Sequence, residues 1–111
     1  MQIYDYHTAG GKNVIQAYFK KQTNKIWSEY QDIRIIIDKY GVLAFKEFLN
    51  TRQLRGKLWE IRFSNERIAY VILNEDAVIF VHAFKKQKNK TEEHDINLAL
   101  KRLNEMSRKL R

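Results

Sequence analysis

Two arginines stand on either side of a predicted hairpin turn. Arg62 lies near the end of the alternating segment 58–63, and Arg67 opens the next segment after a polar turn, so we expect them to lie close together. A pair of guanidinium groups can bind a phosphate through paired hydrogen bonds and stabilise negative charge that develops on it during a reaction. The alternative is structural, because each arginine could instead pair with Glu60 or Glu66 on a solvated face.

A second set of cations follows the last predicted strand. Lys85 and Lys86 close that strand beside the arginine hairpin, where an ammonium group could stabilise a phosphorane, protonate a leaving oxygen or anchor a phosphate. Lys88 and Lys90 continue the run, and together with Lys57 they are candidates for contacts with a nucleic-acid backbone. An ordinary solvated basic loop would have the same composition, so both interpretations stay open.

His82 is the only histidine within a predicted strand, and its imidazole could titrate near neutral pH as a base or an acid. It alternates with Phe80 and Phe84, however, so it could equally face the core as a hydrogen-bonded structural histidine, which is the favoured interpretation. His7 and His94 are predicted to lie at the surface.

Three further side chains have more than one possible role. Glu60 could activate a ribose 2′-hydroxyl, but its spacing places it beside Arg62 and favours a salt bridge. Tyr70 could stack on a base, although packing in the core is favoured, and Trp59 is predicted to be a core residue. The sequence has no cluster of His and carboxylates at metal-ligand spacing, no nucleophile elbow and no phosphate-binding glycine loop. We therefore predict neither a metal nor a cofactor.

Helical spacing dominates the first half of the chain. Asn13 is predicted to cap a short helix, and Thr23 or Asn24 a longer one that Gly41 would end in a left-handed cap. Apolar residues step by three and four along the longer helix, at Ile26, Tyr30, Ile33, Ile37 and Tyr40. Residues 42–49 predict another short helix.

Strand spacing takes over near residue 58. Segments 58–63, 67–73 and 77–84, divided by polar turns, predict an antiparallel meander whose apolar third strand is central. Thr91 is predicted to cap a last helix with apolar residues at Ile96, Leu100, Leu103 and Leu110. With a weak strand over Ile3–Tyr6, these elements predict an α+β domain in which N-terminal helices pack on an antiparallel sheet that also carries a C-terminal helix.

The composition limits the class of protein. The chain has 111 residues, the size of one domain, and a formal net charge of +8, which favours a polyanionic partner, with nucleic acid first and an anionic membrane or an acidic protein as alternatives. No cysteine is present, so disulfides and thiolate metal sites are excluded. The N-terminus lacks a signal-peptide pattern, and the apolar runs are too short to span a bilayer. We expect a cytoplasmic protein without a membrane contact.

Three segments in order resemble a known family: residues 54–63 (LRGKLWEIRF), 67–70 (RIAY) and 81–88 (VHAFKKQK). They are similar to the HigB-like, phage-derived branch of the RelE/ParE superfamily, whose members are toxins of type II toxin–antitoxin systems. The ordered set covers roughly residues 54–102, and the predicted helix over 13–19 also fits the start of the family.

The chain departs from the family pattern at two positions. Ala83 stands where the family usually has Gly, which bears on the geometry at the end of the last strand. Glu92 stands where Pro usually opens the last helix, a milder change because proline at that position only pre-sets the first turn.

The resemblance implies a RelE-like microbial RNase fold over residues 1–111 and a metal-independent mRNA interferase that cleaves messenger RNA, often on the ribosome, and so inhibits translation. It also implies neutralisation by a HigA-like helix-turn-helix antitoxin, with operator DNA bound only through the complex. The candidate catalytic residues are Arg62, Arg67, Lys85, Lys86 and His82.

Two other functions fit the same chain. A ParE-like toxin has this topology but inhibits DNA gyrase without nuclease activity, so it would cause DNA damage and leave messenger RNA intact. A non-catalytic nucleic-acid-binding module would show steep salt dependence and no toxicity.

Overall fold

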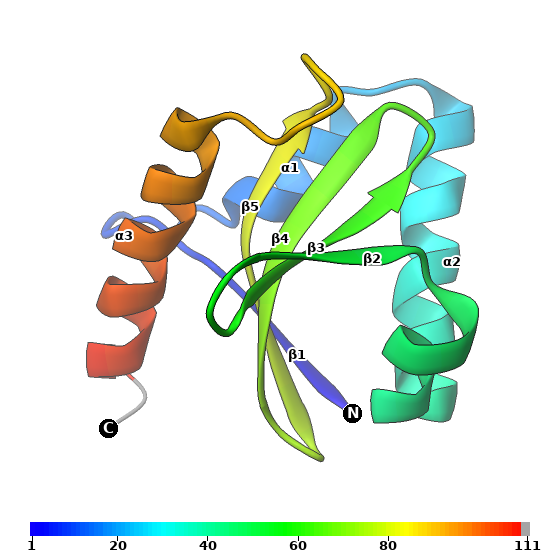
Figure 1. The fold of residues 1–111 in the computed structure, drawn as a ribbon, viewed down its shortest axis with the longest axis horizontal. Coiled ribbons are helices and arrows are strands. Elements are labelled where there is room, and N and C mark those ends of the chain that lie inside the picture. Colours follow the sequence, from blue (N-terminus) through cyan, green and yellow to red (C-terminus); the bar gives the residue numbers. More distant parts are fainter. Residues whose placement is uncertain (110–111) are drawn as a thin grey trace.

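The computed structural model describes residues 1–109, which form a five-stranded sheet with helices packed on both of its faces (Figure 1). In chain order the elements are β1 (Gln2–Asp5), α1 (Val14–Lys20), α2 (Asn24–Tyr40), the π-helical turn η1 (Ala44–Phe48), β2 (Thr51–Arg55), β3 (Leu58–Phe63), β4 (Glu66–Asn74), β5 (Ala77–Lys85) and α3 (Glu93–Lys109). The predicted α+β class is confirmed.

The sheet has the strand order β1-β5-β4-β3-β2. The predicted meander is confirmed as β3, β4 and β5, and β5 is internal, since β4 and β1 flank it. β1 pairs with β5 in parallel, however, with Gln2 opposite Ala77 and Asp5 opposite Phe80, so the sheet is mixed and our expectation of a wholly antiparallel sheet was wrong. The direction of β1 depends on a partner more than seventy residues away, which local spacing does not reveal.

The edge strand β2 was not predicted. It pairs antiparallel to β3, with Thr51 opposite Ile61 and Arg52 opposite Glu60, and a register shift follows between Gln53 and Arg55. None of the residues of β2 is fully buried, so its sequence TRQLR has no need of apolar residues at alternate positions. An edge strand with polar side chains is stable here because β3 supplies its backbone partners.

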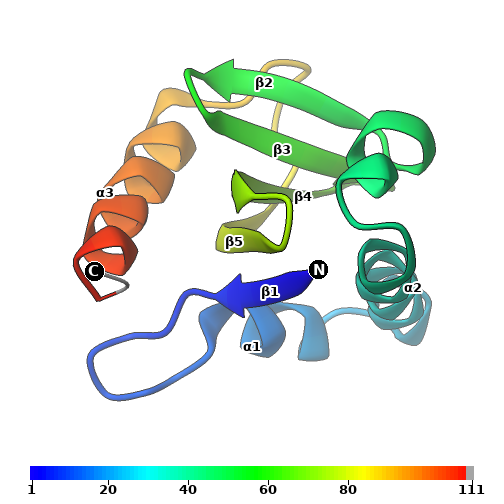
Figure 2. The same cartoon turned by 90° about the horizontal axis from the view of Figure 1, so that it is seen from below.

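The two faces of the sheet carry separate cores (Figure 2). On what we call the α1–α2 face, residues of α1, α2 and η1 pack on β-strand residues such as Ile61, Ile68 and Phe80. On the α3 face, Ile96 and Ala99 of α3 pack on strand residues that include Leu58, Val71 and Ile79. Since successive strand residues point to opposite faces, the position of each polar side chain along β3, β4 and β5 decides which core it borders.

Side-chain caps set the helix starts as predicted. Asn13 Oδ1 accepts hydrogen bonds from two backbone amides at the start of α1, at 3.0 and 3.1 Å, and Thr23 Oγ1 accepts one from Ile26 at 3.2 Å. Gly41 ends α2 with φ +60° and ψ −135°, a conformation that favours glycine but is not the left-handed helical one that we expected.

Several predicted core or cap positions were wrong. Tyr40 and Trp59 are 38% and 37% exposed, because Tyr40 lies in the last turn of α2 and Trp59 lies on β3 where no helix covers the sheet. α3 begins at Glu93, two residues after Thr91, and the Thr91 hydroxyl donates a hydrogen bond to Glu60 instead of capping the helix. Leu110 lies outside the described residues.

The cap of α1 gives a direct test of this fold. Replacing Asn13 by Ala removes the acceptor for two amides and also a hydrogen bond to Asp5, so the free energy of unfolding should fall by about 1 kcal/mol or somewhat more. The exposed Asn97 of α3 is a matched control, and Asn97→Ala should change it by less than about 0.5 kcal/mol. Equal effects in urea denaturation would contradict the assigned cap.

Candidate nucleic-acid interface

Arg62 and Arg67 lie directly opposite each other on β3 and β4, as predicted from the hairpin. A two-residue turn joins the strands, and Ser64 in it has a φ of +49°. Both guanidinium groups approach the same carboxylate, with Arg62 Nε 3.8 Å and Arg67 Nε 3.9 Å from Glu60 Oε2. We call Glu60, Arg62 and Arg67 the arginine cluster. It lies on the α3 face of the sheet.

The carboxylate of Glu60 is buried and fixed. Only 2% of the residue is exposed, and Thr91 Oγ1 donates a hydrogen bond of 2.5 Å to Glu60 Oε1. The salt bridge expected between Glu60 and Arg62 is present but long, and Arg67 shares it. A buried carboxylate must be compensated, so Glu60 holds the two guanidinium groups in place and is itself too enclosed to reach a ribose.

The two arginines differ in their surroundings. Arg67 is 5% exposed and donates a hydrogen bond of 2.8 Å to the carbonyl oxygen of Glu66. Burial, followed by the neighbouring charge of Arg62, lowers the pKa of Arg67. Arg62 keeps 26% of its side chain exposed, and its Nε atom is buried without a hydrogen-bond partner among the described residues. Two cations therefore face one anion, which leaves room for a second anion at Arg62.

Arg52 of β2 is a further cation on this face that the sequence did not point to. It lies opposite Glu60 in the β2–β3 register and is exposed. Since paired residues share a face, Arg52 borders the arginine cluster. Arg52 could have been placed near Arg62 only if β2 had been predicted as a strand, and the polar sequence of β2 gives no strand pattern.

Lys85 does not join the arginine cluster, contrary to our expectation that the cations would converge. It pairs with Glu66 in the β4–β5 register, and its Nζ is 2.9 Å from Glu66 Oε1, on the α1–α2 face. Tyr18 donates a hydrogen bond of 2.6 Å to the other oxygen of Glu66, and burial, then Glu66, raises the pKa of Tyr18. The separation follows from alternation, because Arg67 lies opposite Phe84 and the next residue must point the other way.

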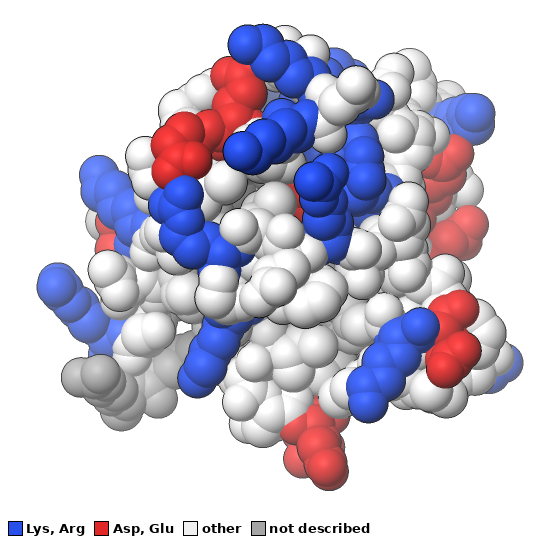
Figure 3. Space-filling view, viewed as in Figure 1, with Lys and Arg blue, Asp and Glu red and all other residues white. Residues whose placement is uncertain are grey.

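The other lysines are spread over the chain. The backbone amide of Lys86 donates to Asn65 at 2.7 Å, which extends the strand pairing by one residue, so alternation directs its side chain to the same face as Phe84. Lys88 and Lys90 are exposed in the loop before α3, whereas Lys57 lies at the opposite end of β3 from Arg62. Lys and Arg gather over the upper part of the molecule in Figure 3, around the ends of β3 and β4 and the loop after β5.

His82 is a buried structural residue, as the sequence favoured. It is 9% exposed, its Nε2 is 2.8 Å from Asp95 Oδ1, and its Nδ1 is 3.3 Å from Arg102 Nη1. Because a guanidinium can only donate, Nδ1 must accept, and the proton of the neutral ring lies on Nε2. Burial, with help from the charge of Arg102, lowers the pKa of His82 despite the opposing effect of Asp95. Both ring nitrogens are engaged by α3, so neither is presented to a substrate. His7 and His94 are exposed, as predicted.

Two further findings concern metal sites and membrane-spanning helices. Among residues 1–109, no group of three or more His, Asp or Glu side chains is placed to hold a metal ion. Within the same residues, every helix is too short or too polar to cross a membrane. The candidate interface is thus a set of cations on one sheet face, and within residues 1–109 Glu60 is the buried carboxylate that both Arg62 and Arg67 approach.

The fold and the arginine cluster define a small α+β protein with a cationic sheet face. The chain belongs to the family described as Phage derived protein Gp49-like (DUF891), whose model matches residues 36–104, more than half of the sequence. Members of this family are commonly toxins of toxin–antitoxin systems. No curated protein matches the chain.

The state of His82 predicts how stability depends on pH. Its pKa in the folded protein is below the ordinary value of 6.5, so its contribution is fully present above about pH 6.5 and is lost as the pH falls through the folded pKa. The free energy of unfolding of the wild type should therefore decrease on acidification. Part of that decrease should be missing in His82→Gln, and all of it should be retained in the control His7→Gln, which changes an exposed histidine that does not act on His82. Identical pH profiles for all three proteins would contradict the buried neutral ring.

The arginine cluster predicts a specific effect of anions. Inorganic phosphate should raise the Tm of the wild type more than chloride at equal ionic strength, because it binds the folded state at Arg62. Arg62→Gln should reduce the difference between the salts to the nonspecific stabilisation that phosphate gives any protein, whereas Arg108→Gln, which removes the same charge from an exposed position on α3, should leave the difference unchanged. An equal difference in wild type and Arg62→Gln would contradict an anion at Arg62.

Proposed function

We propose that this chain is the toxin of a type II toxin–antitoxin system and acts as a HigB-like mRNA interferase. The observation that carries the proposal is the arginine cluster: two guanidinium groups fixed against one buried carboxylate, with an excess positive charge, in a member of a toxin-associated family. The net charge of +8 favours attraction to RNA.

The proposed reaction needs no metal. The 2′-hydroxyl of a ribose loses its proton to water and its oxygen attacks the adjacent phosphorus. The bond from phosphorus to the 5′-oxygen breaks, and the products carry a 2′,3′-cyclic phosphate and a 5′-hydroxyl. Arg62 would bind a non-bridging oxygen, whose charge increases in the phosphorane, and the nearly buried Arg67 would add positive charge behind it. Lys86, directed to the same face, would protonate the departing 5′-oxygen.

The cluster lacks a free base, since Glu60 is enclosed and both nitrogens of His82 are engaged. Such an enzyme depends on substrate positioning and charge stabilisation. We therefore propose that the ribosome orders the messenger RNA, so that cleavage of free RNA is weak and inhibition of translation is strong. Action on the ribosome would take place in the cytoplasm.

The partner in this proposal is a HigA-like antitoxin with a helix-turn-helix domain. An acidic segment of the antitoxin would neutralise the toxin by covering the cations around the arginine cluster, because charge complementarity favours such a contact. Operator DNA would be bound by the complex through the antitoxin.

Cell-free translation with primer extension tests the proposed activity. The wild type should stop protein synthesis and create new messenger ends, and Arg62→Lys should reduce cleavage at least about 100-fold, since an ammonium group cannot replace the planar fork that contacts phosphate. Lys25→Gln, at an exposed position on α2, should leave cleavage unchanged.

Unimpaired translation without new ends would overturn the proposal. DNA damage in cells without messenger cleavage would indicate a gyrase inhibitor instead. Steep salt-dependent RNA binding by a non-toxic protein would indicate a binding module.

A further inference from the structure

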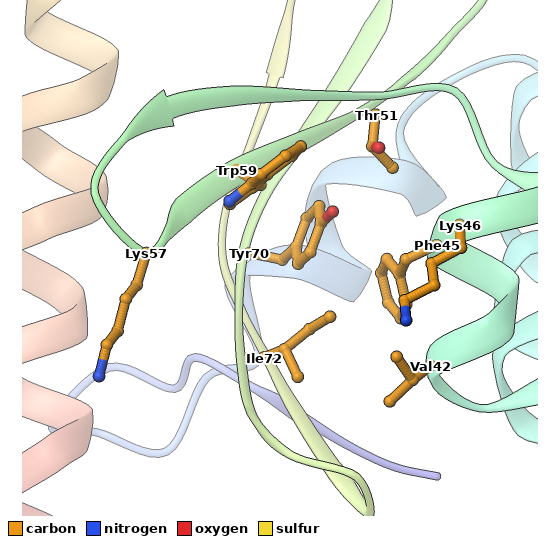
Figure 4. A pocket seen from close by; sticks show the side chains of 8 residues that line it. All are labelled: Val42, Phe45, Lys46, Thr51, Lys57, Trp59, Tyr70 and Ile72. Carbon is orange, nitrogen blue, oxygen red and sulfur yellow. The ribbon is translucent and has the colours of Figure 1, made fainter.

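A second concave surface lies on the α1–α2 face, between η1 and strands β2 to β4 (Figure 4). The cavity has a volume of about 410 Å³, within the range of pockets that bind small molecules. Phe45, Tyr70, Ile72 and Trp59 turn towards the same space, with Lys46 at one rim and Lys57 at the other. The arginine cluster lies on the opposite face of the sheet and has no residue in this cavity.

Trp59 is the unusual residue of this cavity. It is 37% exposed, although its strand neighbours Leu58 and Glu60 are almost fully buried. Tyr70 lies opposite Trp59 in the β3–β4 register, is 3% exposed, and packs on Phe45 with ring centroids 4.7 Å apart. The cavity therefore has a rigid aromatic floor and, at its open side, an indole that can still accept a stacking partner.

The charge of the lining restricts the occupant. Its charged residues are Lys46 and Lys57, and it contains no Asp or Glu. Burial raises the pKa of Tyr70 to about 12, so the phenol remains a neutral donor at neutral pH. An apolar space with an exposed indole and two flanking ammonium groups complements a ligand that is flat, aromatic and negatively charged at its ends.

We propose that this cavity binds one unstacked nucleobase of single-stranded RNA, with the base on Trp59 and the adjoining phosphates on Lys46 and Lys57. The inference rests on the proposed function, because it names a contact for the same substrate. An apolar helix from a protein would fill the space without using the two lysines, so charge complementarity favours the nucleotide.

The position of the cavity assigns it to a nucleotide other than the scissile one. Trp59 and Arg62 are three residues apart on β3, about 10 Å along the strand, and point to opposite faces. An RNA strand that contacts both must pass around the edge formed by β2, where exposed Arg52 borders the path. The cavity thus fixes a neighbouring base while the arginines bind the phosphate that is cut.

Tryptophan fluorescence provides the test. Trp27→Phe leaves Trp59 as the sole tryptophan, and Trp27 is partly buried on α2 away from the cavity lining, so the change is conservative. Eight-nucleotide single-stranded RNA should quench Trp59 on binding, whereas inorganic polyphosphate, which carries charge but no bases, should not. In the wild-type background, Trp59→Ala should weaken RNA binding between about 5- and 100-fold, as expected for one stacked base, and Trp59→Phe should weaken it less.

No quenching by RNA, or equal quenching by polyphosphate, would overturn the base-binding cavity. A second result would also overturn the base-binding cavity. If an apolar helical peptide displaces RNA from Trp59, and if Lys46→Gln and Lys57→Gln leave the RNA affinity unchanged, the cavity is a protein-docking surface. Because the single-tryptophan protein keeps Trp59, the test does not depend on whether Trp59→Ala folds.

The same titration separates this inference from the proposed function. With Arg62→Gln added to Trp27→Phe, saturating RNA should still quench Trp59, although more RNA is needed and messenger cleavage is lost. Messenger cleavage by the wild type without quenching of Trp59 would contradict only the base-binding cavity. Quenching without any cleavage would contradict only the proposed nuclease activity.

Discussion

The α3 face of the sheet depends on one buried carboxylate. Glu60 is 2% exposed in a sheet covered on both faces, where an uncompensated charge would cost several kcal/mol. Arg62, Arg67 and the Thr91 hydroxyl compensate it, and Arg67 is held in turn by a backbone carbonyl of its own strand. Folding therefore orients the two guanidinium groups before any ligand arrives, which is the condition for efficient stabilisation of a transition-state charge.

Strand alternation distributes the rest of the chemistry. Arg52, Arg62 and Arg67 share one face, because Arg62 pairs with Arg67 and Arg52 pairs with Glu60, which lies two residues before Arg62. Lys85, one residue beyond the partner of Arg67, falls on the other face and binds Glu66. Trp59 lies on that face too, at the open cavity. The same rule thus places three arginines on one side of the sheet and an aromatic cavity on the other.

Much of the local structure could be predicted because short-range rules decide it. The caps at Asn13 and Thr23, the stripe of α2 and the antiparallel meander follow from spacing within a few residues. The proximity of Arg62 and Arg67 follows from the tight turn between them.

The remaining features depend on partners distant in sequence. The parallel pairing of β1, the polar strand β2 and the contact of Thr91 with Glu60 are all made across the fold. The exposure of Trp59 depends on where α2 and η1 stop covering the sheet, which spacing alone does not define. Consequently the arginine pair was predicted, whereas Arg52 was missed and Lys85 was expected on the wrong face.

The central claim is that RNA phosphate binds Arg62 beside the buried Arg67, and NMR of the arginine side chains tests it most directly. A short RNA with a 2′-O-methyl group at every ribose cannot be cleaved, so it can be titrated at equilibrium into protein labelled with nitrogen-15. We expect the Nε–H signals of Arg62 and Arg67 to shift together and to saturate with the RNA. Saturating binding that leaves both signals unchanged while other arginines shift would contradict the claim.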